Sequence, residues 1–348
     1  WLQRRVYCLF NIFNQTREEM KSTIYYVFYL LSCLMLCCCH ESNTIENTPK
    51  TSKDNNPSSL ETLFGNDTTT HHNNHHSTWN EGENEEENEE DIQSAINSMN
   101  THFGEPAEDM EPLKSASVIL NVKNAEEFIF ALGSDVTIII DSDEDIDITE
   151  IIKKLPEYNY KTNMEPGIYT NYEETLLLVG ITNLTIQGKS ENPERTHIAT
   201  QTWYADVIST YKCSNIQFRN LKLGHKVEEG GCDGGVLYLD QTNNVEIDNC
   251  KLYGCGVNGL TLSKCDNINV TNTEIYKCSD YAMSAADTCN NVLLKNCNIW
   301  GCANGFFTDK DVQRIELRQC QIDVNEAQVY GNGPLRFTDT EWYQKRED

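Results

Sequence analysis

A repeated pattern of polar and apolar positions occupies residues 213–324. Each copy reads polar-polar-apolar-x-apolar-x-Asn, with Asn as the second polar residue in the first four copies and Gln in place of the final Asn in the last copy. The first apolar residues of the copies are Ile216, Val245, Ile268, Val292 and Ile315, at steps of 29, 23, 24 and 23 residues. A fixed period of this length is typical of repeat proteins in which each repeat is one supersecondary unit. The sequence therefore predicts a solenoid.

The alternation inside each copy predicts strands. Val245 and Ile247 share one face of a strand, and Glu246 points to the other. No copy has the length or the spacing of a helix, which excludes leucine-rich and α-helical repeats. Three short strands in each repeat of 22 to 24 residues form one coil of a parallel β-helix. The predicted fold class is an all-β solenoid, in which a coil buries its apolar face against its neighbours.

Stacked coils turn equivalent positions into columns. The inward columns begin at Ile216, Phe218 and Leu223, and a column of Asn residues from Asn220 marks a turn, because Asn tolerates left-handed backbone. The chain has 15 cysteines, ten of them in the repeats. Thr replaces Cys in two of the cysteine columns, which favours small buried apolar residues over disulfides. Cys232 lies in a loop, and a disulfide stays open for it, since an exported protein permits one.

The segment before the repeats has a different pattern. Val118–Val122 and Val136–Ile140 are predicted strands, residues 124–132 a helix capped by Asn124, and residues 148–155 a second short helix. We expect a small α/β N-terminal cap over residues 112–165, covering the open end of the solenoid. The β-helix then spans residues 166–330, and residues 331–348 form a C-terminal segment.

Residues 40–111 predict a disordered linker. They are rich in Asn, Thr, Ser and Glu and hold 17 acidic residues against two lysines. Such a segment buries too little apolar surface to offset chain entropy. The net charge of −27 also argues against nucleic acid as a partner, because phosphate binding needs basic surface. The histidines of residues 71–76 could bind a metal or be incidental to a polar linker.

The start of the chain predicts export. Met20 and Lys21 precede the apolar run of residues 24–39, which has the layout of a secretory signal and is short for a membrane span. Residues 1–19 then lie upstream of the true start or mark a fragment end. Leu30-Leu31-Ser32-Cys33 resembles a bacterial lipobox, which would make Cys33 the lipidated residue. An ordinary cleaved signal and an uncleaved signal anchor remain open. The predicted location is a bacterial outer membrane or cell surface, otherwise secreted or periplasmic.

The repeats resemble the right-handed parallel β-helix repeats of the pectate-lyase-like group. Residues 234–239 (Gly-Gly-Val-Leu-Tyr-Leu) and 249–256 (Asn-Cys-Lys-Leu-Tyr-Gly-Cys-Gly) are most similar to its bacterial surface lipoproteins. The group includes polysaccharide lyases, polygalacturonases, mannuronan epimerases and phage tailspikes. The resemblance implies a right-handed coil and a polysaccharide partner. It specifies no reaction, because one fold hosts many chemistries.

The catalytic motifs of that group are not found in the chain. Gly224-His225-Lys226 lacks the second Gly of a polygalacturonase-like Gly-His-Gly, and the clustered Asp ligands of a pectate-lyase-like site are absent. No cofactor is therefore expected, with calcium as the alternative if the protein is lyase-like. Asp240, Ser263 and Asp287 are expected in one column, as turn residues.

The long step between Ile216 and Val245 predicts a surface loop at residues 224–235. Insertions in solenoids tend to carry function. The loop holds candidate catalytic residues for acid–base chemistry: His225, Glu228, Glu229 and Asp233. A solvated glycine-rich loop is the alternative.

An outward aromatic column is the second candidate feature. Tyr253, Tyr276 and Trp300 follow the inward Leu or Ile of successive coils, so they point outward and could stack on sugar rings. Alternatively, the column packs under the C-terminal segment. The sequence thus predicts an exported β-helix that binds or processes polysaccharide, as a lyase or hydrolase if it is an enzyme. The competing hypothesis is a structural or adhesive surface module.

Overall fold

The computed structural model describes residues 104–114, 116–160, 165–227, 231–254, 256–323 and 328–344. All of them belong to one compact unit, Thr78–Asp348. The signal segment with Cys33, residues 40–103 of the linker, and the loop residues Glu228 and Glu229 lie outside the described residues. Within the described ranges, no helix is long and apolar enough to cross a membrane.

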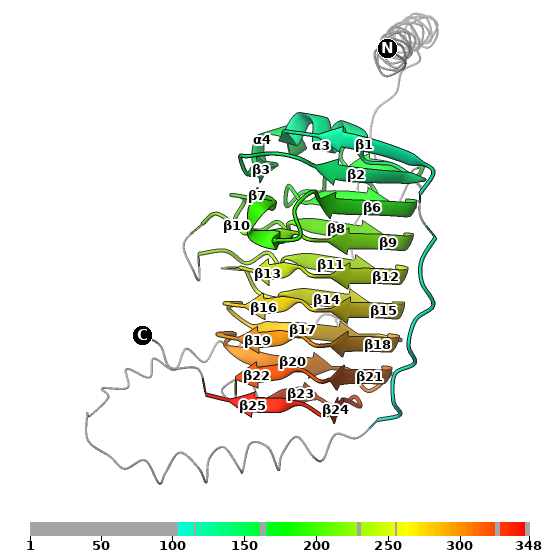
Figure 1. Cartoon of the computed structure of the whole chain (residues 1–348), viewed down its shortest axis with the longest axis vertical. Coiled ribbons are helices and arrows are strands. Elements are labelled where there is room, and N and C mark those ends of the chain that lie inside the picture. The colour runs from blue at the N-terminus through cyan, green and yellow to red at the C-terminus, as the bar shows by residue number, and fades with distance from the viewer. Residues whose placement is uncertain are drawn as a thin grey trace, which may run out of the picture. The chain divides into compact units, whose positions relative to one another are not determined.

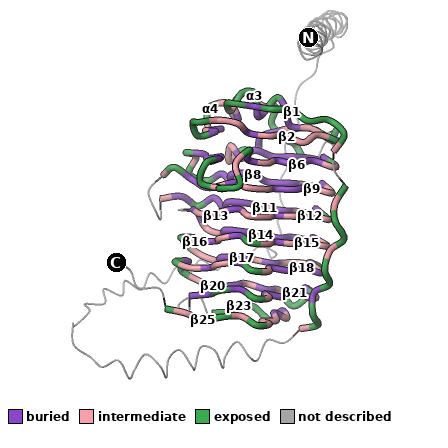
Figure 2. Tube along the Cα trace, viewed as in Figure 1, coloured by how far each residue is buried: buried purple, intermediate pink, exposed green. Residues whose placement is uncertain are grey.

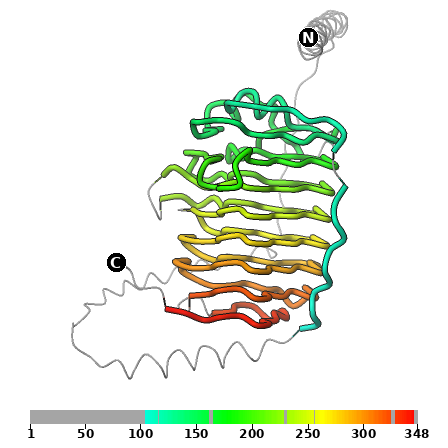
Figure 3. The backbone as a smooth tube through the Cα atoms, in the orientation of Figure 1, coloured from blue at the N-terminus to red at the C-terminus, as the bar shows by residue number. Residues whose placement is uncertain are grey.

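The chain winds into a β-helix with three sheets (Figures 1 and 3). Apart from the antiparallel β4–β5 pair, the strand pairings of the described residues are parallel. Each coil contributes one strand to each sheet, which confirms the predicted parallel solenoid.

Sheet 1 has nine strands: β1 (Val118–Val122), β2 (Val136–Ile140), β6 (Thr182–Gly188), β9 (Ser214–Arg219), β12 (Asn243–Asp248), β15 (Asp266–Thr271), β18 (Asn290–Lys295), β21 (Gln313–Arg318) and β24 (Arg336–Thr338). Sheet 2 has eight: β3 (Ile146–Asp147), β7 (His197–Thr200), β10 (Lys222–His225), β13 (Lys251–Tyr253), β16 (Glu274–Tyr276), β19 (Asn298–Trp300), β22 (Gln321–Asp323) and β25 (Glu341–Tyr343). Sheet 3 also has eight: β4 (Gly167–Tyr169), β5 (Leu176–Val179), β8 (Ile208–Tyr211), β11 (Leu237–Asp240), β14 (Leu260–Ser263), β17 (Tyr281–Ala286), β20 (Asn304–Thr308) and β23 (Val329–Gly331).

The predicted inward columns form the core. Ile216 pairs with Val245, and Val245 with Ile268, so the columns are in register from coil to coil. Figure 2 shows the buried residues along the strands of every coil. Ile216, Val245 and Phe218 are fully buried. The apolar period of the sequence therefore sets the register of the sheets.

Single residues with left-handed backbone make the sharp turns between sheets. The predicted Asn column does so, with φ of 56° at Asn220, 50° at Asn249 and 50° at Asn272. A second Asn column that the sequence analysis did not single out lies at the start of the sheet 1 strands. There Asn291 Nδ2 donates to Asn267 Oδ1 over 2.8 Å, and Asn267 Nδ2 donates to Asn244 Oδ1 over 3.2 Å. These amide ladders tie each coil to the next.

The repeat cysteines are mostly buried free thiols, as the sequence predicts. Eight described cysteines are free, and burial raises the pKa of Cys213 to about 11 and that of Cys250 to about 12. The Cys265 thiol donates to Leu239 O, one coil away, over 3.2 Å. Cys232, which the sequence left open, is disulfide-bonded.

The cap holds the expected elements. Both of its predicted strands form with the expected bounds, as β1 and β2, and the helix α3 (Ala125–Ala131) begins where Asn124 Oδ1 accepts from Glu127 N over 2.9 Å. The second helix, α4 (Thr149–Ile152), is shorter than predicted. A 3-10 helix, η1 (Pro193–Arg195), follows β6. Because β1 and β2 extend sheet 1, the strands of the cap continue the solenoid, and Phe128 and Ile129 of α3 join its core.

The C-terminal segment also extends the solenoid. β24 pairs with β21, and β25 pairs with β22, so the segment forms a further coil instead of packing over the aromatic column. Phe337 and Trp342 pack against the core, with ring centroids 5.2 Å apart.

Residues 104–114, which the sequence assigned mainly to the linker, form an extended strap along the outer face of sheet 1 (Figures 1 and 2). The strap begins at Gly104 beside Pro334 in the last coil. It runs toward the cap, and Lys114 O lies 3.5 Å from the side-chain nitrogen of Gln217 in β9. The chain therefore crosses most of the solenoid before it enters β1.

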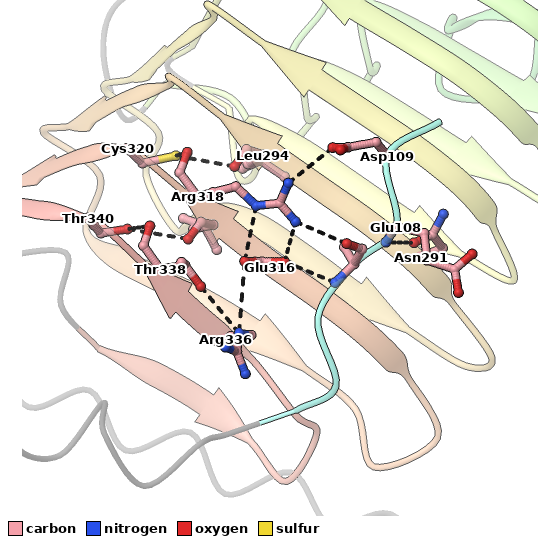
Figure 4. Close-up of polar contacts among 12 residues, drawn as sticks. Glu108, Asp109, Asn291, Leu294, Glu316, Arg318, Cys320, Arg336, Thr338 and Thr340 are labelled. Carbon is pink, nitrogen blue, oxygen red and sulfur yellow. Dashed lines mark hydrogen bonds and ion pairs between the residues drawn. The ribbon is translucent and has the colours of Figure 1, made fainter. Parts of the chain in front are cut away.

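Arg318 and Glu316 hold the strap (Figure 4). Arg318 donates to Ala107 O over 3.0 Å, to Asp109 over 3.0 Å and to Glu316 over 2.9 Å. Glu316 is 1% exposed and accepts from Ala107 N over 3.0 Å. Burial acts to raise the pKa of Glu316, but the hydrogen bonds from Arg318, Thr338 and the backbone of Ala107, with the charge of Arg318, together outweigh it, and the pKa lies below its usual value. A buried ionised carboxylate thus joins the strap to the sheet.

Replacing Arg318 tests this clamp. We expect Arg318→Ala to lower the free energy of unfolding by about 3 kcal/mol, because it leaves the charge of Glu316 buried without its main partner. Urea unfolding measures the loss, and limited proteolysis reports cleavage within residues 104–114. The control is Arg336→Ala, whose Nε lies 3.9 Å from Glu316 and should matter far less. Equal losses in the two variants would contradict the assignment.

Candidate functional site

The predicted aromatic column exists as a ladder on the outer side of sheet 2. The rings of Tyr253 and Tyr276 stack with centroids 5.7 Å apart and planes 25° apart. Those of Tyr276 and Trp300 stack at 4.7 Å and 15°. Because each ring lies over its neighbour, the faces between them are covered and the edges remain for other contacts. A sugar ring that stacks on an aromatic residue needs an open face, and Tyr276 has a neighbouring ring on each side. Sugar binding by Tyr253, Tyr276 and Trp300 stays a prediction.

Charged side chains line the aromatic ladder. Lys222 and Lys251 lie over the rings of Tyr253 and Tyr276, at 4.9 Å and 6.0 Å from their centroids. Both ammonium groups are paired with Glu194 over 2.9 Å. These cations are therefore neutralised within the protein.

A Tyr–His–Asp series lies at the cap end of the ladder. The Tyr253 hydroxyl is 2.8 Å from His197 Nε2, and His197 Nδ1 is 3.2 Å from Asp145 Oδ2. Burial lowers the pKa of His197 despite the nearby Asp145, so the ring is neutral at pH 7. Nδ1–H then donates to Asp145 and Nε2 accepts from the tyrosine hydroxyl. Lys226 Nζ, 3.0 Å from Asp145, completes a polar junction between cap and solenoid.

His225 and Asp233, the described members of the predicted catalytic loop, support another loop. His225 lies in β10, is 2% exposed, and donates from Nε2 to Ala205 O over 2.8 Å. Burial lowers its pKa, and Nδ1 is buried without a hydrogen-bond partner. The backbone N of Asp233 donates to Trp203 O over 2.7 Å. Catalysis by the two residues stays a prediction, and their observed contacts hold residues 203–205 in place.

That supported loop forms one wall of an open hollow of about 530 Å³, which we call the cap pocket. Tyr172, Trp203 and Tyr204 are 83%, 59% and 62% exposed. Two lining residues lie in or directly after α4, and four directly follow β7. Figure 1 shows α4 and β7 at the cap end of the solenoid. The pocket is lined by Thr149, Lys153, Tyr172, Glu173, Glu174, Gln201, Thr202, Trp203 and Tyr204.

The aromatic loop between β7 and β8 is held at both ends. Gln201 N donates to Thr149 Oγ1 over 2.9 Å, and Gln201 Nε2 donates to Asp147 Oδ2 over 2.7 Å. Asp206 Oδ1 accepts from Gly235 N over 2.8 Å. A Cβ added at Gly234 would lie 1.9 Å from Ala205 O, so only glycine permits this close approach. The rings of Trp203 and Tyr204 are exposed on a fixed backbone.

The cap pocket and the aromatic ladder are neighbours. Asp147, which accepts from Gln201 in the pocket, lies 3.7 Å from Lys226 Nζ. Lys226 in turn reaches Asp145, the end of the Tyr–His–Asp series. Polar contacts thus run without a break from the ladder to the pocket.

The sequence pattern does not predict Tyr172, Trp203 and Tyr204 as site residues, because they belong to no repeat column. Their signal was a cluster of large aromatic residues in polar turns, as in Gln201-Thr202-Trp203-Tyr204. The loops that carry Tyr172 and Trp203 are separate in sequence and meet only after the coils stack. Among the described residues, no group of His, Cys, Asp and Glu side chains is placed to hold a metal.

Asp240 and Asp287 do not share a column, contrary to the sequence prediction. Asp240 pairs with Ser263, and Ser263 pairs with Ala286, so Asp287 falls one position later, in a turn with φ of 57°. The Ser263 hydroxyl donates to Asp287 over 2.7 Å. That hydrogen bond lowers the pKa of Asp287, whereas burial raises the pKa of Asp240. The pKa of Asp240 is therefore shifted upward and that of Asp287 downward.

These opposite shifts predict opposite effects of amide substitution. At pH 7, Asp240→Asn removes a carboxylate that burial disfavours and should raise the free energy of unfolding. Asp287→Asn removes a favoured carboxylate and should lower it. Each change should stay below about 1 kcal/mol, because both groups are partly solvated. The Asp287 effect should fade as the pH falls through its depressed pKa. Urea unfolding at pH 7 and pH 3 provides the measurement, and changes of the same sign would contradict it.

Several solved structures share a similar fold with this chain. An alginate lyase from a Paenibacillus species is 12% identical, with a TM-score of 0.41, and the match covers 66% of this chain and 77% of that one. A polygalacturonase from Erwinia carotovora is 10% identical, with a TM-score of 0.38, and the match covers 70% of this chain and 98% of that one. A pectate lyase is 9% identical, with a TM-score of 0.34 and coverage of 60% and 64%. No curated protein matches the sequence. Residues 206–339 match the family model described as the right handed beta helix region.

Proposed function

We propose that this protein is an exported surface β-helix that binds polysaccharide, and that the cap pocket is its binding site. The observation that carries the proposal is the group of exposed rings of Tyr172, Trp203 and Tyr204 around one hollow. Exposed apolar side chains that cluster mark interaction sites, whereas single ones are ordinary surface.

The pocket has the composition that a sugar requires. Aromatic rings supply flat apolar faces for the C–H side of a sugar ring, and the open faces of Trp203 and Tyr204 meet this need. Gln201, Thr202 and Glu173 supply polar groups for its hydroxyls. The fixed backbone of the aromatic loop reduces the entropy lost on binding.

The direction of the strap supports a role at a surface. The strap starts beside the last coil, whereas residues of α4 and of the turns before β5 and β8 line the cap pocket, and α4 lies at the opposite end of the solenoid (Figure 1). A chain tethered through the residues before the strap would therefore carry the pocket at the end away from its attachment.

Polysaccharide binding by the full chain tests the site. Affinity gel electrophoresis against a panel of plant, algal and bacterial polysaccharides should find a ligand. Trp203→Ala combined with Tyr204→Ala should weaken its binding at least about tenfold, equivalent to about 1.4 kcal/mol. The matched controls are Tyr276→Ala and Trp300→Ala, which alter rings of the ladder and should leave affinity nearly unchanged.

Each other outcome has a definite meaning. If only the ladder variants lose binding, the ladder is the site, and the prediction for Tyr253, Tyr276 and Trp300 replaces the pocket. If no polysaccharide binds, the proposal fails in favour of a structural or adhesive module. Where a ligand is found, release of reducing ends or unsaturated products tests processing, and His225→Ala and Asp233→Ala test the predicted catalytic loop.

Export and lipidation form a separate part of the proposal, supported by the pattern of residues 20–39. In a Gram-negative bacterial host, the full chain should incorporate labelled palmitate and enter the membrane fraction. Cys33→Ser should abolish the label, whereas Cys38→Ser should keep it. Label retained in Cys33→Ser would refute Cys33 as the acceptor, and unlabelled secreted wild type would indicate a cleaved signal.

A further inference from the structure

The charged side chains that line the cap pocket are unbalanced. They are Lys153, Glu173 and Glu174, one cation against two carboxylates. The cation is paired with a carboxylate outside the pocket lining. Lys153 Nζ lies 2.8 Å from Glu150 Oε1, and this hydrogen bond raises the pKa of Lys153. The pocket therefore presents a net negative charge to a ligand.

The carboxylate of Glu173 is held by a neutral group. Asn171 Oδ1 accepts from the backbone N of Glu173 and of Thr175, each over 3.0 Å, and fixes the turn. Asn171 Nδ2 donates to Glu173 Oε2 over 3.3 Å. Neutral donors orient a carboxylate and leave its charge in place.

The charge of Glu173 also acts on the end of the aromatic loop. Burial raises the pKa of Asp206 there, and the charge of Glu173 acts in the same direction, so Asp206 itself adds little to the negative field. The net charge of the chain, −27, has the same sign. An approaching polyanion would meet repulsion both at long range and at the pocket itself.

From this charge arrangement we infer that the cap pocket selects glycans without carboxylate groups, neutral or amino-bearing sugars, and rejects polyuronates. The inference rests on the proposed function, since it specifies the ligand class of the same pocket. Like charges that face each other across an interface weaken binding. Neutral sugars avoid this repulsion and still stack on the aromatic rings. The ammonium group of an amino sugar would be attracted both to the rings and to the carboxylates.

A chemically matched pair of polymers tests the selection. The neutral polysaccharide that the full chain binds is oxidised at its C6 primary hydroxyls to carboxylates, which keeps the backbone and linkage. We expect the oxidised polymer to bind at least about tenfold more weakly at low salt. Added salt should reduce this difference, because it screens repulsion between exposed charges.

A charge-reversal variant supplies the second arm. Glu174→Lys should bind the oxidised polymer more tightly than the wild type does, so the ratio of the affinities for the neutral and oxidised polymers should fall. Asp339→Lys is the matched control, because it makes the same change in net charge at a residue with the same left-handed backbone, φ of 51° against 62° at Glu174. Asp339 lies in the turn before β25, in the last coil, so this variant should leave the preference unchanged.

The outcomes separate the two claims. If the oxidised polymer binds as tightly as its neutral parent, or if the two lysine variants shift the preference equally, the charge selection is wrong and polysaccharide binding stands. If no polymer of either kind binds the full chain, the proposed function fails, and the inference fails with it.

Discussion

The structure depends on the register between successive coils. Apolar residues such as Ile216, Val245 and Ile268 lie directly above one another, and each is buried only because the next coil covers it. Strands about 4.8 Å apart leave no room for a misplaced residue in such a column. Single left-handed residues at the turns keep the register, because they bend the chain from one sheet to the next without adding length. Every other feature is placed by this stacking.

Stacking also decides what the surface of a sheet can do. Identical outward positions in successive coils become neighbours, so Tyr253, Tyr276 and Trp300 bury their faces on one another. Their lysine and glutamate neighbours pair in the same way. In a regular column, each side chain therefore finds its contacts in the neighbouring coils. The open rings and the unbalanced charges lie where regularity ends, in the turns beside the cap.

The two ends of the solenoid are joined by the strap. A strand at either end of a β-helix exposes unpaired backbone groups, a hazard that native proteins cover or shorten. Here the cap strands and the C-terminal coil extend the sheets with short strands, and the strap packs along sheet 1 from one end toward the other. Its anchoring by Arg318 and Glu316 fixes the course of the chain before the first strand.

The solenoid, the register of its coils, the turn asparagines and the burial of the cysteines could be predicted from the sequence, because each depends on residues one period apart. Both cap strands and the capped helix could also be predicted, because their signals are local. The partners of His225, the offset of Asp287 from Asp240, and the assembly of Tyr172 with Trp203 could be seen only in the folded chain. These contacts join turns of different length, and the path of an irregular turn is set by what it packs against. The structure of the periodic part can therefore be predicted from its repeat, whereas the residues of the candidate site come together only once the coils have stacked.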